Sequence, residues 1–203
     1  MSTNGFYDQQ IVYPSLQIIS QRADDIRTEV QLATHSKDWT PWPENLWDER
    51  LGHRWSVIPL FAFGKWATKF SSSFPKTCQL LSKLPNLRTA LFSKMGPKTV
   101  LKSHTGWDQL ANTVLRCHLG LKVPLDGKSG VWVNGVKQSH TMNEWLVFDD
   151  SLLHSGYNMS DEERIVLIID LDRPAGVPPG TAKGGYTKEV MDLISKTIGI
   201  LPE

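Results

Sequence analysis

The spacing of apolar residues predicts helices near both ends of the chain and short strands between them. Within residues 15–34, apolar positions recur at near-helical intervals among charged ones, which predicts an amphipathic helix. Residues 38–57 are rich in Pro and Trp and predict an irregular wrapping segment, followed by a strand over residues 58–66. Residues 75–87 begin with a proline, which suits the first turn of a short helix. A last helix is expected within residues 185–200, because its apolar residues share one face.

Between residues 88 and 174 the pattern changes to many short strands separated by Gly, Pro, Asn and Asp. Asn134-Gly135, between two alternating runs, is a strong β-hairpin signal. Many short strands in one region predict a closed or double-sheeted β architecture. We therefore expect one mainly β domain with flanking helices over residues 1–203. Its β core would lie in residues 88–174, with an N-terminal helix and wrapping segment in residues 1–75 and a C-terminal helix docked on the core.

Composition and charge narrow the choice of partners. The 203 residues carry 22 Lys and Arg against 21 Asp and Glu, so no excess positive charge points to nucleic acid. Cys78 and Cys117 make neither a disulfide framework nor a zinc pattern, and we expect buried thiols in a reducing compartment. No signal peptide and no apolar run long enough to span a bilayer are visible. A cytoplasmic protein with no membrane partner is expected, and its oligomeric state stays open.

The eight tryptophans are the one compositional oddity, because five of them fall in the first third of the chain. One interpretation makes them large core and edge fillers that each need a partner for the indole N–H. The other makes them an aromatic surface that lines a substrate site. The residues concerned are Trp39, Trp42, Trp47, Trp55 and Trp66.

Strand alternation places polar residues on one face of two predicted strands. In residues 112–123, Arg116 and His118 share a face with small residues, while the opposite face is apolar. That polar face fits either a barrel lumen or a solvated surface. Arg164 opens the last long strand, where a guanidinium is costly to bury unless it meets an anion. The alternative for Arg164 is a pairing with one of the nearby acids Asp161, Glu162 and Glu163.

Two further histidines lie at the ends of predicted strands. His104 follows a strand-like run and precedes Thr105 and Gly106, and His154 follows an apolar strand. Two imidazoles from separate strand ends suit a divalent first-row metal, and iron(II) in oxygenases commonly adds one carboxylate. A lone histidine at either place is more often structural, so the residues alone leave both interpretations open.

Five segments, in this order and spacing, resemble the aspartyl/asparaginyl β-hydroxylase family of iron(II)- and 2-oxoglutarate-dependent oxygenases. They read PKTCQLL, FSKMGPKTVLKSHTG, LRCHLGLKVP, LVFDDSLLHS and RIVLIIDLDRP, and together they extend over roughly residues 60–174. The resemblance implies a double-stranded β-helix, a cupin-like jelly roll, that uses Fe(II), 2-oxoglutarate as co-substrate and O2.

The same resemblance implies roles for individual residues. His104 and His154 match the two iron ligands and would form the catalytic centre. Ser93, His118 and Arg164 match the 2-oxoglutarate binders, with Arg164 clamping the distal carboxylate. Arg116 matches a position that in the family can meet an acidic substrate group. Gly106 matches the position of the third metal ligand and offers no carboxylate there. Water would fill that position, and in related halogenases a small residue there makes room for a halide.

We expect an oxygenase that hydroxylates an unactivated C–H bond of a small molecule, such as an amino acid or a biosynthetic intermediate, with release of succinate and CO2. The segment between His104 and His118 differs from enzymes that act on protein domains, which favours a small substrate. Alternatives are a halogenase or peptidyl Asp/Asn β-hydroxylase on the same site, a zinc-dependent hydrolase, and a non-catalytic cupin-like binding module. Residues expected near the predicted mouth, on the substrate side with Arg116, are Trp107, Trp132, His140 and Asn158.

Overall fold

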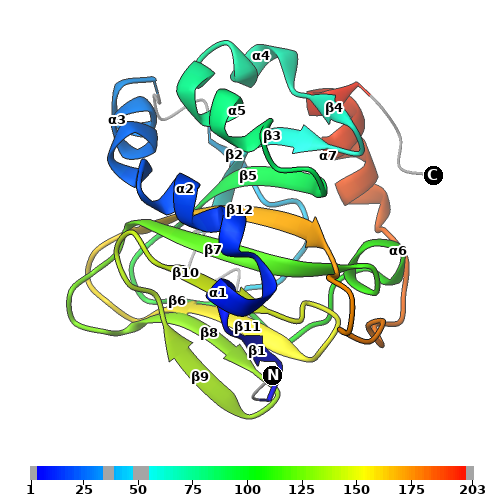
Figure 1. The fold of residues 1–203 in the computed structure, drawn as a ribbon. Helices are drawn as coiled ribbons and strands as arrows, with labels where there is room; N and C mark the ends of the chain where they lie inside the picture. Colours follow the sequence, from blue (N-terminus) through cyan, green and yellow to red (C-terminus); the bar gives the residue numbers. More distant parts are fainter. Residues whose placement is uncertain (1–3, 34–38, 48–54, 200–203) are drawn as a thin grey trace.

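A computed structural model describes residues 4–33, 39–47 and 55–199, which form stacked layers of helix and sheet (Figure 1). The strands of the larger sheet lie in the order β1 (Phe6–Tyr7), β10 (Trp145–Phe148), β7 (Val114–Lys122), β12 (Arg164–Asp172), β5 (Leu87–Met95), β3 (Trp55–Ala62) and β2 (Thr40–Pro41), with β4 (Lys65–Trp66) paired to β3. The smaller sheet has the order β6 (Thr99–Val100), β11 (His154–Asn158), β8 (Ser129–Val133) and β9 (Val136–Ser139). Neighbouring strands are antiparallel in both sheets.

The helical segments within residues 17–33 and 68–81 pack on the outer face of the larger sheet, and the smaller sheet lies on its other side (Figure 1). The helices are α1 (Gln9–Val12), a 3-10 turn (Pro14–Leu16), α2 (Gln17–Ser20), α3 (Ala23–Ala33), α4 (Thr68–Ser71), α5 (Pro75–Leu81), α6 (Asp108–Ala111) and α7 (Lys188–Ile198). Two facing antiparallel sheets with flanking helices confirm the predicted mainly β class and the cupin-like jelly roll. No helix in the described ranges has the length and apolar character needed to cross a bilayer.

Several predicted elements are confirmed with altered bounds. The helix expected over residues 15–34 is interrupted after α2, where the Arg22 N–H donates to the Ile19 carbonyl in a tight turn. This turn lets Ile19 of α2 and Ile26 of α3 enter the same core. Asn134 and Gly135 both have positive φ and join β8 to β9, as the hairpin signal predicts. The C-terminal helix α7 ends at Gly199, whose positive φ suits a helix terminus.

The alternation of β7 and β12 separates a core face from a polar inner face. Apolar residues of both strands join the main core under the helices. Arg116, His118 and Arg164 instead point between the two sheets, where they line a cavity together with residues of the smaller sheet. The lumen interpretation of the polar face of β7 is therefore confirmed. The core-facing residues of the two strands are Leu115, Cys117, Leu119, Leu121, Leu167, Ile169 and Leu171.

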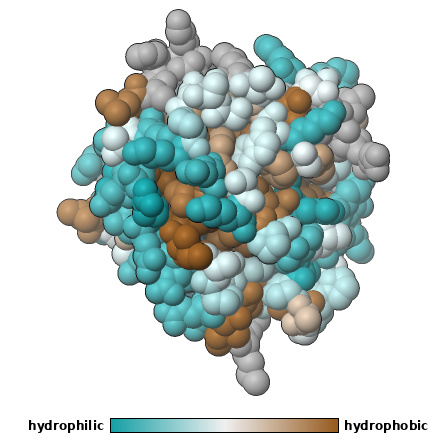
Figure 2. All heavy atoms as spheres, turned by 45° about the horizontal axis from the view of Figure 1, so that its top comes forward, coloured by the Kyte–Doolittle hydropathy of each residue, from teal (hydrophilic) through white to brown (hydrophobic). Residues whose placement is uncertain are grey.

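The face of the molecule that carries the helices is mostly polar (Figure 2). Figure 2 turns the helical side of the molecule forward and shows hydrophilic side chains over most of this face, with hydrophobic ones in smaller patches between them. The C-terminal helix α7 packs against β3. This placement gives α7 a role in closing a cavity, described below.

Candidate active site

Main-chain pairing brings His104 and His154 together from segments 50 positions apart. The N–H of each residue donates to the carbonyl oxygen of the other, at 2.9 Å in both directions. The two imidazole rings consequently lie side by side, with centroids 4.4 Å apart. The main-chain pairing of the segment after β6 with the start of β11 thus sets the spacing of the two rings.

Hydrogen bonds to the backbone determine the tautomer of both histidines. His104 Nδ1 lies 2.8 Å from the Lys102 carbonyl oxygen, and His154 Nδ1 lies 2.9 Å from that of Leu152. Because a carbonyl only accepts, each Nδ1 carries a proton, which makes Nε2 the nitrogen that can offer a lone pair. Burial, reinforced by the nearby His104, also holds the pKa of His154 well below its usual value. Two imidazoles oriented in this way suit a divalent metal.

Asp150 lies beside this pair and was not among the residues singled out from the sequence. Its Oδ1 is 3.2 Å from His154 Nε2, and only 1% of its side chain is exposed. A Cβ added at Gly106 would collide with the Asp150 carboxylate, so the side-chain space at position 106 is already taken. The sequence offered one clue to this residue, because Asp150 precedes His154 by four positions in FDDSLLH.

The donor set is therefore two histidines with a carboxylate nearby. Among the described residues, no group of three His, Cys, Asp or Glu is arranged to hold a metal ion by itself. The Asp150 carboxylate is also shared, because its Oδ1 accepts from Arg116 Nη1 at 2.6 Å. Burial raises the pKa of Asp150 and Arg116 opposes that rise.

Arg116 is held between two buried carboxylates. Its Nε and Nη2 donate to the two oxygens of Asp170 at 2.8 and 3.0 Å, while Nη1 donates to Asp150. Burial opposes the charge, but Asp150 and Asp170 together raise the pKa of Arg116 above its usual value. The contact of Arg116 with an acidic substrate group stays a prediction. Asp150 and Asp170 would compete with such a group for the guanidinium.

Arg164 is buried with no acidic partner in the described residues. Only 2% of it is exposed, and its guanidinium contacts Ser93 Oγ at 3.4 Å and the Met95 sulfur. Two of the acids considered as alternative partners are paired elsewhere: Asp161 with Lys98 and Glu163 with Lys122. Burial lowers the pKa of Arg164 to about 9. A buried guanidinium with no counter-ion is a site that an anion would stabilise.

Ser93 and His118 lie in the same narrow cavity as Arg164, together with His104 and His154. Ser93 Oγ accepts a hydrogen bond from the Trp55 indole N–H at 3.0 Å, which leaves the serine hydroxyl hydrogen available for donation. His118 Nε2 is buried and has no hydrogen-bond partner among the described residues. The structure thus gathers the three residues matched to 2-oxoglutarate binding around one cavity.

His140 lies beside His118. It lines neither the cavity around Arg164 nor a second, larger cavity beside His104 that is described below. His118 Nδ1 and His140 Nε2 are 3.1 Å apart, so one of these nitrogens donates to the other. Burial first, then neighbouring positive groups, hold the pKa of both histidines well below the usual value. A neutral pair is therefore expected at neutral pH.

Of the other residues expected on the substrate side, one lines a cavity and two do not. Trp107 lines the larger cavity beside His104. Trp132 on β8 and Asn158 on β11 line neither cavity. The Asn158 amide donates to the carbonyl oxygens of Met95, Gly96 and Glu162, which ties β11 to the start of β12.

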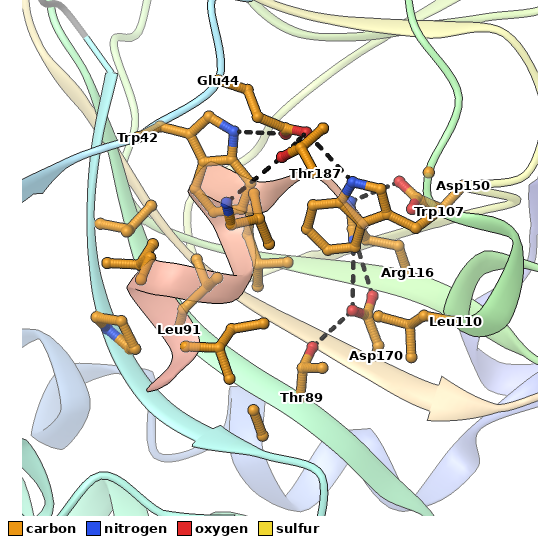
Figure 3. A pocket seen from close by; sticks show the side chains of 18 of the residues that line it. Trp42, Glu44, Thr89, Leu91, Trp107, Leu110, Arg116, Asp150, Asp170 and Thr187 are labelled. Atoms are coloured by element: carbon orange, nitrogen blue, oxygen red, sulfur yellow. Dashed lines mark hydrogen bonds and ion pairs between the residues drawn. The ribbon is translucent and has the colours of Figure 1, made fainter. Parts of the chain in front are cut away.

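A cavity of about 260 Å³ opens beside His104 and Gly106 (Figure 3). Trp42 stacks between two other indoles in its wall, with ring centroids 4.6 Å from Trp55 and 6.0 Å from Trp107. The interpretation of the early tryptophans as a lining surface thus fits Trp42 and Trp55. The core interpretation fits Trp47, and Trp55 as well, because both belong to one buried cluster.

Glu44 joins three elements at the top of this cavity (Figure 3). Its carboxylate accepts from Trp42 Nε1 at 3.0 Å, Trp107 Nε1 at 3.3 Å and Thr187 Oγ1 at 3.0 Å. Because Thr187 caps α7, this carboxylate links the aromatic wall to the C-terminal helix. Glu44 is a second residue that the sequence did not single out.

Known proteins resemble this chain in sequence and in fold. The profile of the aspartyl/asparaginyl beta-hydroxylase family matches residues 20–174. The ornithine lipid ester-linked acyl 2-hydroxylase of Rhizobium tropici is 34% identical over 126 residues, which cover 62% of this chain and 44% of that protein. The aspartyl/asparaginyl beta-hydroxylase of Homo sapiens is 32% identical over 140 residues, or 64% of this chain and 18% of that protein. The chain thus matches less than half the length of either relative.

Among solved structures, HygX from Streptomyces hygroscopicus, with nickel and 2-oxoglutarate bound, shares the fold. The superposition has a TM-score of 0.52 at 12% identity and covers 84% of this chain and 88% of HygX. At this level of identity the likeness concerns the arrangement of strands and helices only.

Proposed function

This chain belongs to the aspartyl/asparaginyl beta-hydroxylase family, and on that premise we propose that it is an iron(II)- and 2-oxoglutarate-dependent oxygenase that hydroxylates an unactivated C–H bond of a small molecule. One observation carries the proposal. The buried, acid-free guanidinium of Arg164 lies in the same cavity as two histidines whose Nε2 lone pairs are oriented for a metal. A metal site and an anion site in one space are what a keto-acid-dependent enzyme requires.

The residues present fit both groups. His104 and His154 would hold the iron, and Asp150 would lie beside it as a hydrogen-bond acceptor for a bound water. Arg164 and Ser93 would bind the distal carboxylate of 2-oxoglutarate, and His118 would donate from Nε2 if Nδ1 accepts from His140. When bound, iron and 2-oxoglutarate supply the activation of O2, with succinate and CO2 as co-products. The protein positions these groups between two sheets and keeps bulk water from them.

The alternatives that share the site fit less well. A halide beside Gly106 would meet the Asp150 carboxylate, which already fills that space, so we favour hydroxylation over halogenation. A zinc hydrolase has no need of a buried anion site like that of Arg164. A binding module without chemistry has no need of two histidines with prepared Nε2 atoms. The relatives' own names point to an ester-linked acyl chain in one case and to Asp or Asn in the other, and both remain to be compared as substrates.

The test is an anaerobic titration of the protein with iron(II) and then 2-oxoglutarate. We expect a weak visible charge-transfer band that requires both components and is lost in His104→Ala. Trp132→Phe is the matched control, since Trp132 lines neither cavity, and it should keep the band. Tight zinc binding with no band in the wild-type protein would refute the proposal.

A further inference from the structure

The larger cavity is apolar where a substrate would approach His104. Alternate residues of β3 turn one face toward it, since Val57, Pro59 and Phe61 line it while Ile58 and Leu60 belong to the core on the other side. The opposite wall is α7, which contributes Val190, Leu193 and Ile194. Stacked indole rings complete the enclosure (Figure 3).

Arg116 and the carboxylates that line this cavity already have hydrogen-bond partners within the protein. Arg116 donates to Asp150 and to both oxygens of Asp170, and Asp170 also accepts from Thr89 Oγ1 at 2.6 Å. Glu44 accepts from two indole N–H groups and from Thr187. Besides Arg116, the one Lys or Arg among the described lining residues is Lys183, whose side chain is exposed.

A substrate carboxylate would therefore find no cation of its own in the interior. To bind one, Arg116 would have to leave Asp150 or Asp170, each of which is 1% exposed. The carboxylate left behind would then be buried without its partner, which is strongly unfavourable. Because Arg116 is already paired with two carboxylates, the inner wall of the cavity disfavours the binding of an acidic group.

We infer that the substrate places an uncharged aliphatic segment, such as the acyl chain of an amphiphile, in this cavity, and that no carboxylate flanks the carbon that reacts. Apolar surface on β3 and α7 would bury the chain, and the reacting carbon would lie at the His104 end. The polar end of the molecule would stay at the exposed mouth near Lys183. The inference rests on the proposed function in naming the occupant a substrate.

Two non-aromatic probes test the inference by tryptophan fluorescence, because three indoles line the cavity. Octanamide represents the neutral chain, and N-acetylaspartate N-methylamide represents the acidic alternative. Leu193→Asp places a carboxylate in the wall formed by α7. Leu125→Asp is the matched control, since Leu125 is 95% exposed and lines neither cavity.

We expect saturable binding of octanamide that weakens by about tenfold or more in Leu193→Asp and is unchanged in Leu125→Asp, because the new carboxylate would have to be buried beside the chain. If Leu193→Asp fails to fold, as judged by circular dichroism, Leu193→Asn takes its place. Tighter binding of the aspartyl probe than of octanamide, or equal binding by the Leu193 and Leu125 variants, would overturn the inference.

A second readout separates this inference from the proposed function. Succinate formation with iron(II), 2-oxoglutarate and O2 should rise when octanamide is added and should not rise with the aspartyl probe. Octanamide binding in a protein that forms no succinate and shows no charge-transfer band would keep the apolar site and refute the oxygenase. Succinate formation that responds only to the aspartyl probe would keep the oxygenase and refute the apolar site.

Discussion

Replacing Arg164 by methionine should stabilise the ligand-free protein. Burial lowers the pKa of Arg164 from its usual value near 12.5 to about 9, and at pH 7.5 the group is still charged. Since one pKa unit corresponds to about 1.4 kcal/mol, holding this charge costs the folded protein on the order of 5 kcal/mol. Loss of the contact with Ser93 offsets about 1 kcal/mol, so we expect a net gain of about 1–4 kcal/mol in the free energy of unfolding.

The assay is urea unfolding at pH 7.5, with and without 2-oxoglutarate in the presence of a divalent metal. At a hundredfold excess over the dissociation constant, the ligand should stabilise the wild-type protein by about 2.7 kcal/mol and the variant far less. Arg173→Met is the matched control, because Arg173 is also buried but donates to Asp149 at 2.5 and 3.0 Å. That variant leaves a carboxylate without its partner and should lose about 3–5 kcal/mol.

Two outcomes would refute the reasoning about Arg164. If Arg164→Met is less stable than the wild-type protein by more than about 1 kcal/mol, the guanidinium is compensated by something other than a ligand. If the variant keeps the full stabilisation by 2-oxoglutarate, the anion binds elsewhere. A gain in stability together with a loss of ligand response would show a site that gives up stability for function.

Three further predictions follow from the same contacts. Asp150→Asn should weaken iron(II) binding by about 10–100-fold in an anaerobic titration, and unchanged affinity would exclude a role for the carboxylate at the metal. Gly106→Ala should lower the free energy of unfolding by about 1–3 kcal/mol because its Cβ meets Asp150 and Ala111, whereas Gly156→Ala, with ordinary contacts, should change it little. Because the pKa values of His118 and His140 are held low mainly by burial, the unfolded chain takes up protons below about pH 6.5 that the folded protein does not. Metal-free protein should then lose about 1.4 kcal/mol per pH unit below that pH for each histidine whose pKa burial lowers, His154 included. His140→Gln, which still offers a donor to His118, should remove about a third of this slope; equal slopes for the variant and the wild-type protein in urea unfolding at several pH values would contradict it.

The sequence by itself determined the class of fold and the faces of its central strands. Alternation alone places Leu115 and Arg116 on opposite faces of one strand, and Leu167 and Arg164 on opposite faces of another, because side chains on a strand point to alternate sides. The hairpin at Asn134-Gly135 is local in the same way. The roles expected for His104, His154, Ser93 and Arg164 needed the family resemblance as well, since a single histidine or arginine in a strand has several explanations.

Only the tertiary structure decided what surrounds those residues. Asp150 lies against Gly106, and Arg116 lies between two carboxylates. Helix α7 and strand β3 form two walls of one cavity. These contacts join segments tens of residues apart, and sheet register and loop path set them rather than any local pattern. Arg116 shows the physical reason most clearly. Its position in β7 follows from the sequence, but whether its charge is available to a substrate depends on acids that only folding brings within 3 Å.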